Sequence, residues 1–212
     1  MHRDGEQKKN DSTTLALRGS SVTPAQEATT TPTVYTVGHS TRSIDAFLAL
    51  LAREGIRHLA DIRTFPSSRR HPHFNRDALA SALDASGVHY SHHPALGGRR
   101  TPRGDDENAG WRNAGFRGYA DHMQTTEFAS GVDALVAIAG GERTVTMCAE
   151  AVPWRCHRSL LADYLSMRGS TVLHIMDAKA EAHRLTSFAI LRDGALTYPA
   201  GVTAQEDLFD SR

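Results

Sequence analysis

The segment from residue 33 to residue 62 constrains the fold of this chain more than any other part of it. Thr33–Val37 alternates and is rich in β-branched residues, Ile44–Leu51 carries apolar residues at helical spacing, and His58–Ile62 is a second short apolar run. Gly55 lies where the helix should end. A strand, a helix and a strand within this length predict a right-handed βαβ unit with parallel strands.

The rest of the chain continues this alternation. We expect further helices over 76–86, 119–126, 127–139 and 159–167, further strands over 88–92, 144–147 and 170–175, and a hairpin over 185–198. Ser43 or Thr41 is expected to cap the first helix and Asn75 the second. Residues 94–118 lack periodicity and are predicted to form a long loop. The pattern predicts an α/β fold, a three-layer sandwich with a mainly parallel central sheet and a C-terminal hairpin.

Composition divides the chain into three parts. Residues 1–33 are polar and charged with few large apolar side chains, so we expect a disordered N-terminal arm. Residues 34–199 are long enough for a single α/β domain with its own core, and 200–212 are predicted to be a flexible tail. The chain has two cysteines and no apolar run suited to a secretory signal or a membrane span. These features predict a cytoplasmic protein with no disulfide framework and no membrane partner.

Both cysteines lie in one segment, between a predicted strand and a predicted helix. Cys148 would lie at the carboxyl end of the strand, and Cys156 near the amino end of the helix. Arg155, His157 and Arg158 flank Cys156. Nearby cations and the helix terminus are therefore expected to lower the pKa of its thiol. The alternative is that both cysteines are small buried residues of the core.

Other chemically active side chains follow the predicted strands at the same edge of the sheet. His39 follows the first strand, Asp61 belongs to the end of the second, and Glu150 follows the strand that carries Cys148. Ligands of open α/β sheets bind beyond the carboxyl ends of the strands, so these side chains are expected to converge on one pocket. A structural ion pair between Asp61 and Arg63 is the alternative role of that carboxylate. The candidate catalytic residues are Cys148, Glu150, Cys156, His157, His39 and Asp61.

The arginines are unevenly distributed, although the formal net charge of the chain is zero. The segment from Arg63 to Arg76 holds several arginines and two histidines without an acidic residue, and a second cluster contains Arg99, Arg100 and Arg103. Guanidinium groups bind phosphate oxygens in pairs. These clusters therefore favour a phosphate-bearing partner such as a nucleotide or DNA.

Several short motifs occur in order along the chain and carry a family resemblance. They are Gly38-His39-Ser40, Asp61-Ile62-Arg63, Phe65-Pro66-x-Ser68, Leu96-Gly97-Gly98, Phe116-Arg117-Gly118-Tyr119-Ala120, and Cys148-Ala149-Glu150 followed by Cys156-His157-Arg158. Together they resemble the bacterial family called domain of unknown function 488, over roughly Val34 to Pro199. The resemblance implies an α/β fold and a shared pocket without naming a reaction. With the basic loop, these motifs give the candidate substrate-binding residues Ser40, Arg63, Ser68, Arg69, Arg117, Tyr119 and Arg158.

Two local similarities to cysteine enzymes indicate a role for the thiols. Cys148, a loop, Arg155 and a helix are similar to the anion-binding loop of cysteine-dependent phosphatases and rhodaneses, although this loop contains no glycine. Cys156-His157-Arg158 is similar to the acceptor motif of the alkylguanine alkyltransferases, where a thiolate takes an alkyl group from DNA. The sequence thus predicts an enzyme of nucleic-acid or nucleotide metabolism linked to DNA repair. It would be a cysteine- or carboxylate-dependent transferase or hydrolase on a phosphate-bearing substrate.

A bound metal is possible but not favoured. The chain has twelve histidines, including His71-x-His73, His92-His93 and the pair Cys156-His157. None of these shows the paired spacing of a structural zinc site. A metal held by histidine, cysteine or carboxylate side chains from separate loops stays open as an alternative.

The C-terminal tail carries a signal of a different kind. Gln205-Glu206-Asp207-Leu208-Phe209 is similar to the short peptide by which bacterial replication and repair proteins hold the sliding clamp. Gln205 can form amide hydrogen bonds, while Leu208 and Phe209 can fill an apolar pocket on a partner. The competing hypothesis is a non-catalytic DNA-associated binding module, held by this tail and by salt-dependent contacts of arginines to phosphate.

Overall fold

The computed structural model describes residues 31–104, 107–192 and 194–201. The predicted arm and tail lie almost wholly outside these residues, so both stay predictions, and so does the peptide Gln205–Phe209. Among the helices that the structure describes, none combines the length and the hydropathy needed to cross a membrane.

A six-stranded sheet forms the centre of the described residues, with the strand order β3-β2-β4-β1-β5-β6. The strands are β1 (Thr33–Gly38), β2 (His58–Asp61), β3 (His89–His92), β4 (Thr144–Cys148), β5 (Thr171–Ile175) and β6 (Ala180–Ala182). Each neighbouring pair is parallel except β5 and β6. Strands β7 (Ile190–Arg192) and β8 (Ala195–Thr197) form a separate antiparallel hairpin. The predicted mainly parallel sheet and C-terminal hairpin are confirmed.

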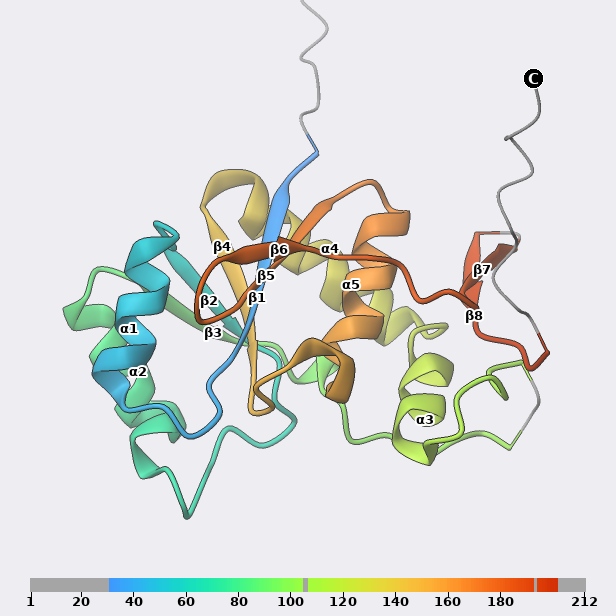
Figure 1. Cartoon of the computed structure of the whole chain (residues 1–212), viewed down its shortest axis with the longest axis horizontal. Helices are drawn as coiled ribbons and strands as arrows, with labels where there is room; N and C mark the ends of the chain where they lie inside the picture. Colours follow the sequence, from blue (N-terminus) through green and yellow to red (C-terminus); the bar gives the residue numbers. More distant parts are fainter. Residues whose placement is uncertain (1–30, 105–106, 193, 202–212) are drawn as a thin grey trace, which may run out of the picture. The chain divides into compact units, whose positions relative to one another are not determined.

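Helices cover both faces of the sheet, which confirms the three layers. They are α1 (Ile44–Arg53), α2 (Arg76–Ala85), α3 (Ala114–His122), α4 (Thr126–Gly141) and α5 (Arg158–Met167), with short 3-10 helices η1 (Pro72–Phe74), η2 (Pro94–Leu96) and η3 (Pro153–Arg155). Figure 1 shows α1 and α2 on one side of the sheet and α4 and α5 on the other.

Two apolar clusters, one on each face of the sheet, join the layers. Because successive side chains of a strand point to opposite faces, β1 contributes Val34 to one cluster and Tyr35 to the other. The cluster beneath α1 and α2 includes Tyr35, Val37, Phe47, Leu59, Leu79, Leu83, Val145 and Met147. The cluster beneath α3, α4 and α5 includes Val34, Ala60, Tyr119, Phe128, Leu135, Leu161 and Leu165. Burial on both faces explains why every residue of β4 is buried.

Helices α1, α3 and α4 begin after residues whose side chains accept hydrogen bonds from the first turn. Ser43 caps α1 in this way, as predicted. Helix α3 begins at Ala114 and not at Tyr119, because the side chain of Asn113 accepts from two backbone N–H groups of that turn. The predicted start was wrong because the first turn of α3 shows no amphipathic pattern.

The direction of the crossover connections changes between β1 and β4. The chain leaves β1 toward α1 on one face and leaves β4 toward α5 on the other, so the two loops diverge. Gly38 pairs with Cys148 at the last position of the ladder, and the N–H of His39 donates to the carbonyl oxygen of Cys148 at 2.9 Å. Doubly wound sheets bind ligands at such a point. The predicted site residues therefore surround the position where this fold forms a crevice.

Candidate active site

The ends of β1 and β4 lie in close contact at the centre of this crevice. A Cβ atom on Gly38 would lie 1.7 Å from the carbonyl oxygen of Glu150 and 2.6 Å from a guanidinium nitrogen of Arg158. Only glycine therefore fits at this position. Ser40 adopts a φ of 52°, and its N–H donates to the carbonyl oxygen of Ala149 at 2.9 Å. The backbone after β1 thus fixes the loop that follows β4.

The two thiols lie beside one imidazole. Nδ1 of His157 is 3.8 Å from the sulfur of Cys148 and 3.7 Å from the sulfur of Cys156. Both cysteines are free and buried. A Cβ atom on Gly98 would lie 2.2 Å from this Nδ1 atom, so the absence of a side chain at Gly98 leaves space for the ring.

The thiol pair is strongly polarised. The pKa of Cys148 is held well below its usual value, chiefly by a hydrogen bond from the Cys156 thiol and further by His157, while burial acts in the opposite direction. The same hydrogen bond and burial raise the pKa of Cys156 well above its usual value. The surroundings therefore favour a negative charge on Cys148 over one on Cys156.

A buried cation lies next to the thiol pair. Arg158 is 1% exposed and donates to the carbonyl oxygens of Glu150 at 2.5 Å and Ala151 at 2.7 Å. Among the described residues, no carboxylate forms an ion pair with this guanidinium. Burial lowers its pKa, and the thiols of Cys156 and Cys148 oppose that effect. Because an uncompensated buried charge is unfavourable, Arg158 favours a negative charge on the thiol pair.

Asp61 and Arg63 form a buried pair at the end of β2. The Nε and NH2 groups of Arg63 donate to the carboxylate at 2.9 Å and 2.6 Å, and Tyr90 donates to it at 2.9 Å. The backbone N–H of Arg63 donates a further hydrogen bond at 3.1 Å. These donors occupy the lone pairs of Asp61 and leave only the NH1 group of Arg63 turned toward His39, at 3.5 Å. The geometry suits a carboxylate that orients an arginine.

His39 is buried and neutral at the edge of the site. Its Nδ1 lies 2.9 Å from the carbonyl oxygen of Ser40, which can only accept, so Nδ1 carries the proton and Nε2 is an acceptor. The ring stacks on Phe74 with centroids 4.2 Å apart. Burial, with a contribution from Arg63, lowers the pKa of His39 to about 4. His39 can therefore accept a hydrogen bond near neutral pH but cannot supply a positive charge.

A cavity of about 680 Å³ opens beside these groups and collects most of the predicted site. The predicted residues that line it are His39, Arg63, Ser68, Arg69, Cys148, Glu150, Cys156 and His157. Arg99 and Arg155 add two further cations to its wall. The cavity therefore brings thiols, an imidazole, a carboxylate and arginines together.

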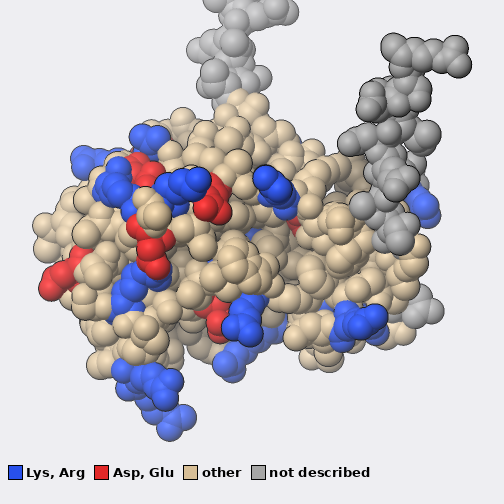
Figure 2. Space-filling view, viewed as in Figure 1, with Lys and Arg blue, Asp and Glu red and all other residues tan. Residues whose placement is uncertain are grey.

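The loop between β2 and α2 forms the basic rim of the cavity. Figure 2 shows basic side chains without acidic neighbours at the tip of this loop. The side chain of Asn75 accepts from the N–H of Ser68 at 2.6 Å, so Asn75 holds the loop and does not cap α2 with its side chain. Phe65 is 64% exposed, and Cζ of Arg99 lies over its ring, 5.9 Å from the ring centroid. The rim thus offers both cations and an accessible aromatic face.

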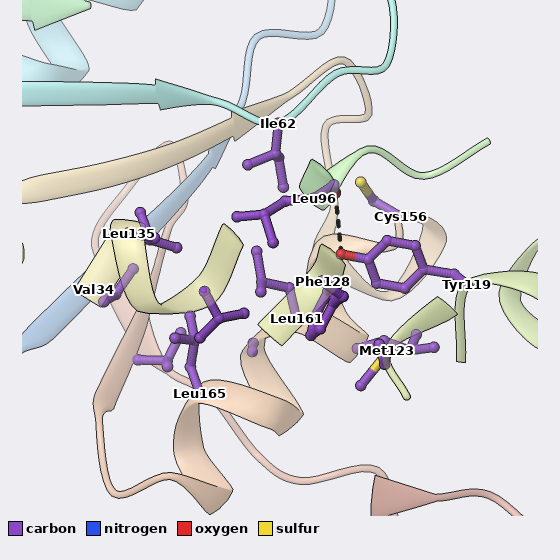
Figure 3. Packing of buried hydrophobic residues seen from close by; sticks show 14 of the residues in the cluster. Val34, Ile62, Leu96, Tyr119, Met123, Phe128, Leu135, Cys156, Leu161 and Leu165 are labelled. Carbon is purple, nitrogen blue, oxygen red and sulfur yellow. Dashed lines mark hydrogen bonds between the residues drawn. The ribbon is translucent and has the colours of Figure 1, made fainter. Parts of the chain in front are cut away.

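Some predicted site residues do not line the cavity but support it. These residues are Ser40, Asp61, Arg117, Tyr119 and Arg158. Tyr119 donates to the carbonyl oxygen of Leu96 at 3.1 Å, within the apolar cluster that also includes Cys156 (Figure 3). Its ring centroid is 4.9 Å from that of His157. Arg117 donates to the carbonyl oxygen of Trp111 at 3.2 Å. Tyr119 therefore packs against the imidazole of His157 without lining the cavity.

The sequence prediction did not include every residue of the cavity wall. The additional residues are Thr64, Phe65, Ser67, Gly98, Arg99, Asn113, Gly115, Phe116, Ala149 and Arg155. Phe65, Gly98 and Phe116 belong to the ordered motifs, and that membership is a signal that could have identified them. Asn113 and Gly115 had no such signal, because the start of α3 was taken as loop.

The thiol group is also the part of the site that can hold a metal. The two sulfurs and Nδ1 of His157 all lie within 4.8 Å of one another. Zinc binds thiolate at about 2.3 Å and imidazole at about 2.0–2.1 Å, so these atoms are close enough to share one soft ion. The prediction that a metal is possible but not favoured stays a prediction.

Comparison with known proteins gives a family and no closer relative. Residues 43–165, more than half of the chain, match the protein-family model described as Domain of unknown function DUF488. Neither a curated protein nor a solved structure matches the chain.

Proposed function

The chain belongs to the family described as Domain of unknown function DUF488, and from this premise we propose that its cavity is the active site of a cysteine-dependent transferase or hydrolase. The substrate carries a phosphate group, as a nucleotide or a nucleic-acid strand does. The observation that carries the proposal is the convergence of Cys148, Cys156 and His157 on a cavity walled by arginines. A polarised thiol in an electropositive cavity is typical of a reactive cysteine.

Cys148 is the nucleophile in this proposal. Its thiolate forms a bond to an electrophilic phosphorus or carbon atom, and the leaving group departs with the bonding electron pair. Glu150 is the carboxylate exposed on the cavity wall and is the candidate acid or base, whereas Asp61 positions Arg63. A second substrate then takes the group from sulfur in a transferase, and water does so in a hydrolase.

The cavity wall supports the proposal of a phosphate-bearing substrate. Arg63, Arg69, Arg99 and Arg155 place four guanidinium groups around it, which suits the doubly charged end of a phosphate ester. Phe65 offers an exposed ring on which a base can stack. A nucleotide or an unpaired nucleotide of a strand satisfies both features.

Protection from alkylation tests this proposal. We expect a nucleoside monophosphate to slow the alkylation of Cys148 in chelator-treated protein, and we expect Arg69→Ala combined with Arg99→Ala to remove that protection. Arg168→Ala is the matched control, because Arg168 pairs with Asp133 and does not line the cavity. Equal alkylation with and without the nucleotide would contradict the assignment of a phosphate-bearing substrate.

The alternative is a DNA-associated binding module without catalysis, since the same arginines can hold phosphate when no thiol reacts. It predicts DNA binding that weakens steeply with salt and survives replacement of Cys148 and Cys156 by serine. Covalent capture of a substrate fragment on Cys148 would instead support the enzyme.

A further inference from the structure

A second group of potential metal ligands lies at the amino ends of the strands, the opposite edge of the sheet from the cavity. His58 begins β2, His89 begins β3, and Glu142 lies just before β4. In the sheet register His58 is beside His89, and Thr144 of β4 lies on the other side of His58. Three distant parts of the sequence therefore meet on a rigid scaffold.

The donor atoms of this group already face one another. Nδ1 of His89 lies 3.0 Å from each carboxylate oxygen of Glu142, and Nδ1 of His58 lies 3.3 Å from Oε2. One ligand atom from each residue lies within 4.8 Å of the others. Zinc binds imidazole nitrogen and carboxylate oxygen at about 2.0–2.2 Å, so two tetrahedral ligands lie about 3.3 Å apart. The observed separations need only small side-chain shifts to admit an ion.

The second ring nitrogen of His58, Nε2, also has a hydrogen-bond partner. Its Nε2 lies 2.7 Å from Oγ of Ser91, which lies 2.7 Å from Nε2 of His93. A metal-binding histidine usually donates its second N–H to an acceptor, which leaves the other nitrogen free for the metal. Ser91 can accept that N–H and donate its own hydroxyl proton to His93. The hydrogen bonds around His58 therefore fit ligation through Nδ1.

The exposure of the three side chains increases from His58 through Glu142 to His89. The side chain of His58 is 12% exposed, that of Glu142 is 36% exposed and that of His89 is 69% exposed. The inner ligand is thus fixed by packing, while the outer ligand leaves access for an ion and for water.

We propose that His58, His89 and Glu142 form a binding site for a divalent transition metal ion. Zinc is the best match to two imidazoles and one carboxylate. On binding, the Nδ1 proton of each imidazole that contacts Glu142 moves to Nε2 of the same ring or to solvent, and water completes the coordination. This site is separate from the thiol cavity and does not depend on the proposed function.

Zinc titration of the untagged full-length chain tests the site. Cys148→Ser with Cys156→Ser removes the thiol ligands, and calorimetry then reports the remaining sites. In that background we expect Glu142→Gln or His58→Ala to weaken binding at least about tenfold, a change of roughly 1.4 kcal/mol. His71→Ala and Glu181→Gln are matched controls from outside the group and should leave the affinity unchanged.

Nitrogen NMR of the imidazoles keeps the test decisive if a variant unfolds. We expect zinc to shift the Nδ1 resonances of His58 and His89 in the double-serine protein. In that protein Glu142 is unchanged, so both histidines keep their contacts to it. Zinc that does not bind, that binds equally to Glu142→Gln, or that shifts Nε2 in place of Nδ1 would overturn the proposal. In those cases Glu142 forms hydrogen bonds with the two histidines, and the group does not bind a metal ion.

Discussion

Cys148 and Cys156 share a hydrogen bond, and their surroundings determine which sulfur holds the negative charge. Cys148 receives that hydrogen bond together with one from His157 and one from the backbone at Ala149. Cys156 donates the shared hydrogen bond and therefore keeps its proton. At the scale of single residues, the proposal therefore assigns the reactive thiolate to Cys148 and its activation to Cys156. The sequence predicted a lowered pKa for Cys156 because three basic residues flank it, and that expectation was wrong, since burial and the hydrogen bond with Cys148 raise this pKa.

Replacement of Cys156 tests this division of roles. In Cys156→Ala we expect the apparent pKa of Cys148 to rise, because the largest cause of its depression is removed. Each unit of pKa changes the thiolate fraction about tenfold below the midpoint. Cys156→Ser is the matched control, since its hydroxyl still donates a hydrogen bond. The measurement is the pH dependence of alkylation, and equal pKa values in both variants would count against the shared hydrogen bond.

Two buried histidines make stability depend on pH. Burial is the main cause that lowers the pKa of His39 and of His174 to about 4. As the pH falls below about 6.5, the unfolded chain takes up protons at these positions while the folded chain does not, so the free energy of unfolding decreases. We expect a loss of about 1–2 kcal/mol per histidine between about pH 7 and pH 5.

Urea unfolding at the two pH values measures this effect. His39→Gln combined with His174→Gln should reduce the pH dependence of the unfolding free energy, whatever its effect on absolute stability. An unchanged dependence in the double variant would show that other groups cause it.

The roles of Asp61 and Arg63 show what can be learned from the sequence at this scale. Their spacing indicated an ion pair as one alternative, and the structure contains that ion pair at 2.6 Å. The third partner, Tyr90, comes from β3 and has no signal in sequence, because strand order decides which side chains of β2 and β3 become neighbours. Long-range partners of this kind require the sheet.

At the scale of elements, the contact between the end of β1 and the loop after β4 defines the site. Gly38 allows the backbone of Glu150 to approach, and Arg158 then holds the same carbonyl oxygen from the start of α5. This arrangement places Cys148, which ends β4, beside Cys156, which precedes α5. The position of the thiols therefore depends on a residue that carries no side chain.

Substitution of glycine by alanine at two positions tests that dependence. Gly38→Ala should destabilise the protein by more than about 2 kcal/mol, because its Cβ would overlap the backbone oxygen of Glu150. Gly140→Ala is the matched control: no atom lies within 4 Å of its Cβ, and α4 should gain up to about 1 kcal/mol. Urea unfolding measures the free energy of unfolding of both variants. An unchanged free energy in Gly38→Ala would contradict the close approach of the Glu150 backbone.

Elements with strong local signals were predicted well, and short elements were not. The β-branched run at Thr33–Val37 and the amphipathic helix after it needed no tertiary information. Strand β6 was missed because Ala180-Glu181-Ala182 has no strand signal and is held by pairing with β5. The start of α3 was missed because its cap, Asn113, follows a segment without periodicity.

At the scale of the whole chain, two chemically distinct groups occupy opposite edges of one sheet. The carboxyl ends of the strands bring together the thiols and arginines, and the amino ends bring together His58, His89 and Glu142. Strand order produces both groups, since each takes residues from strands that are distant in sequence. The cavity was foreseen because strand ends could be recognised, whereas the second group required the order of β2, β3 and β4.

The predicted clamp peptide is independent of the described structure and can be tested separately. Leu208→Ala with Phe209→Ala should abolish binding of the full-length chain to a bacterial sliding clamp, because the two side chains that fill the partner's pocket are removed. Asp210→Ala, a substitution outside the peptide, is the control. Thiol reactivity should be unchanged, and clamp binding that survives the double substitution would remove the peptide from the account.

The most direct test is the alkylation rate of each cysteine as a function of pH, measured by peptide mass spectrometry on the folded, chelator-treated protein. The account predicts that Cys148 reacts with an apparent pKa well below the free-thiol value of about 8.5, and that Cys156 does not. If Cys148 is inert or titrates as a free thiol does, the proposal of a cysteine-dependent enzyme is contradicted.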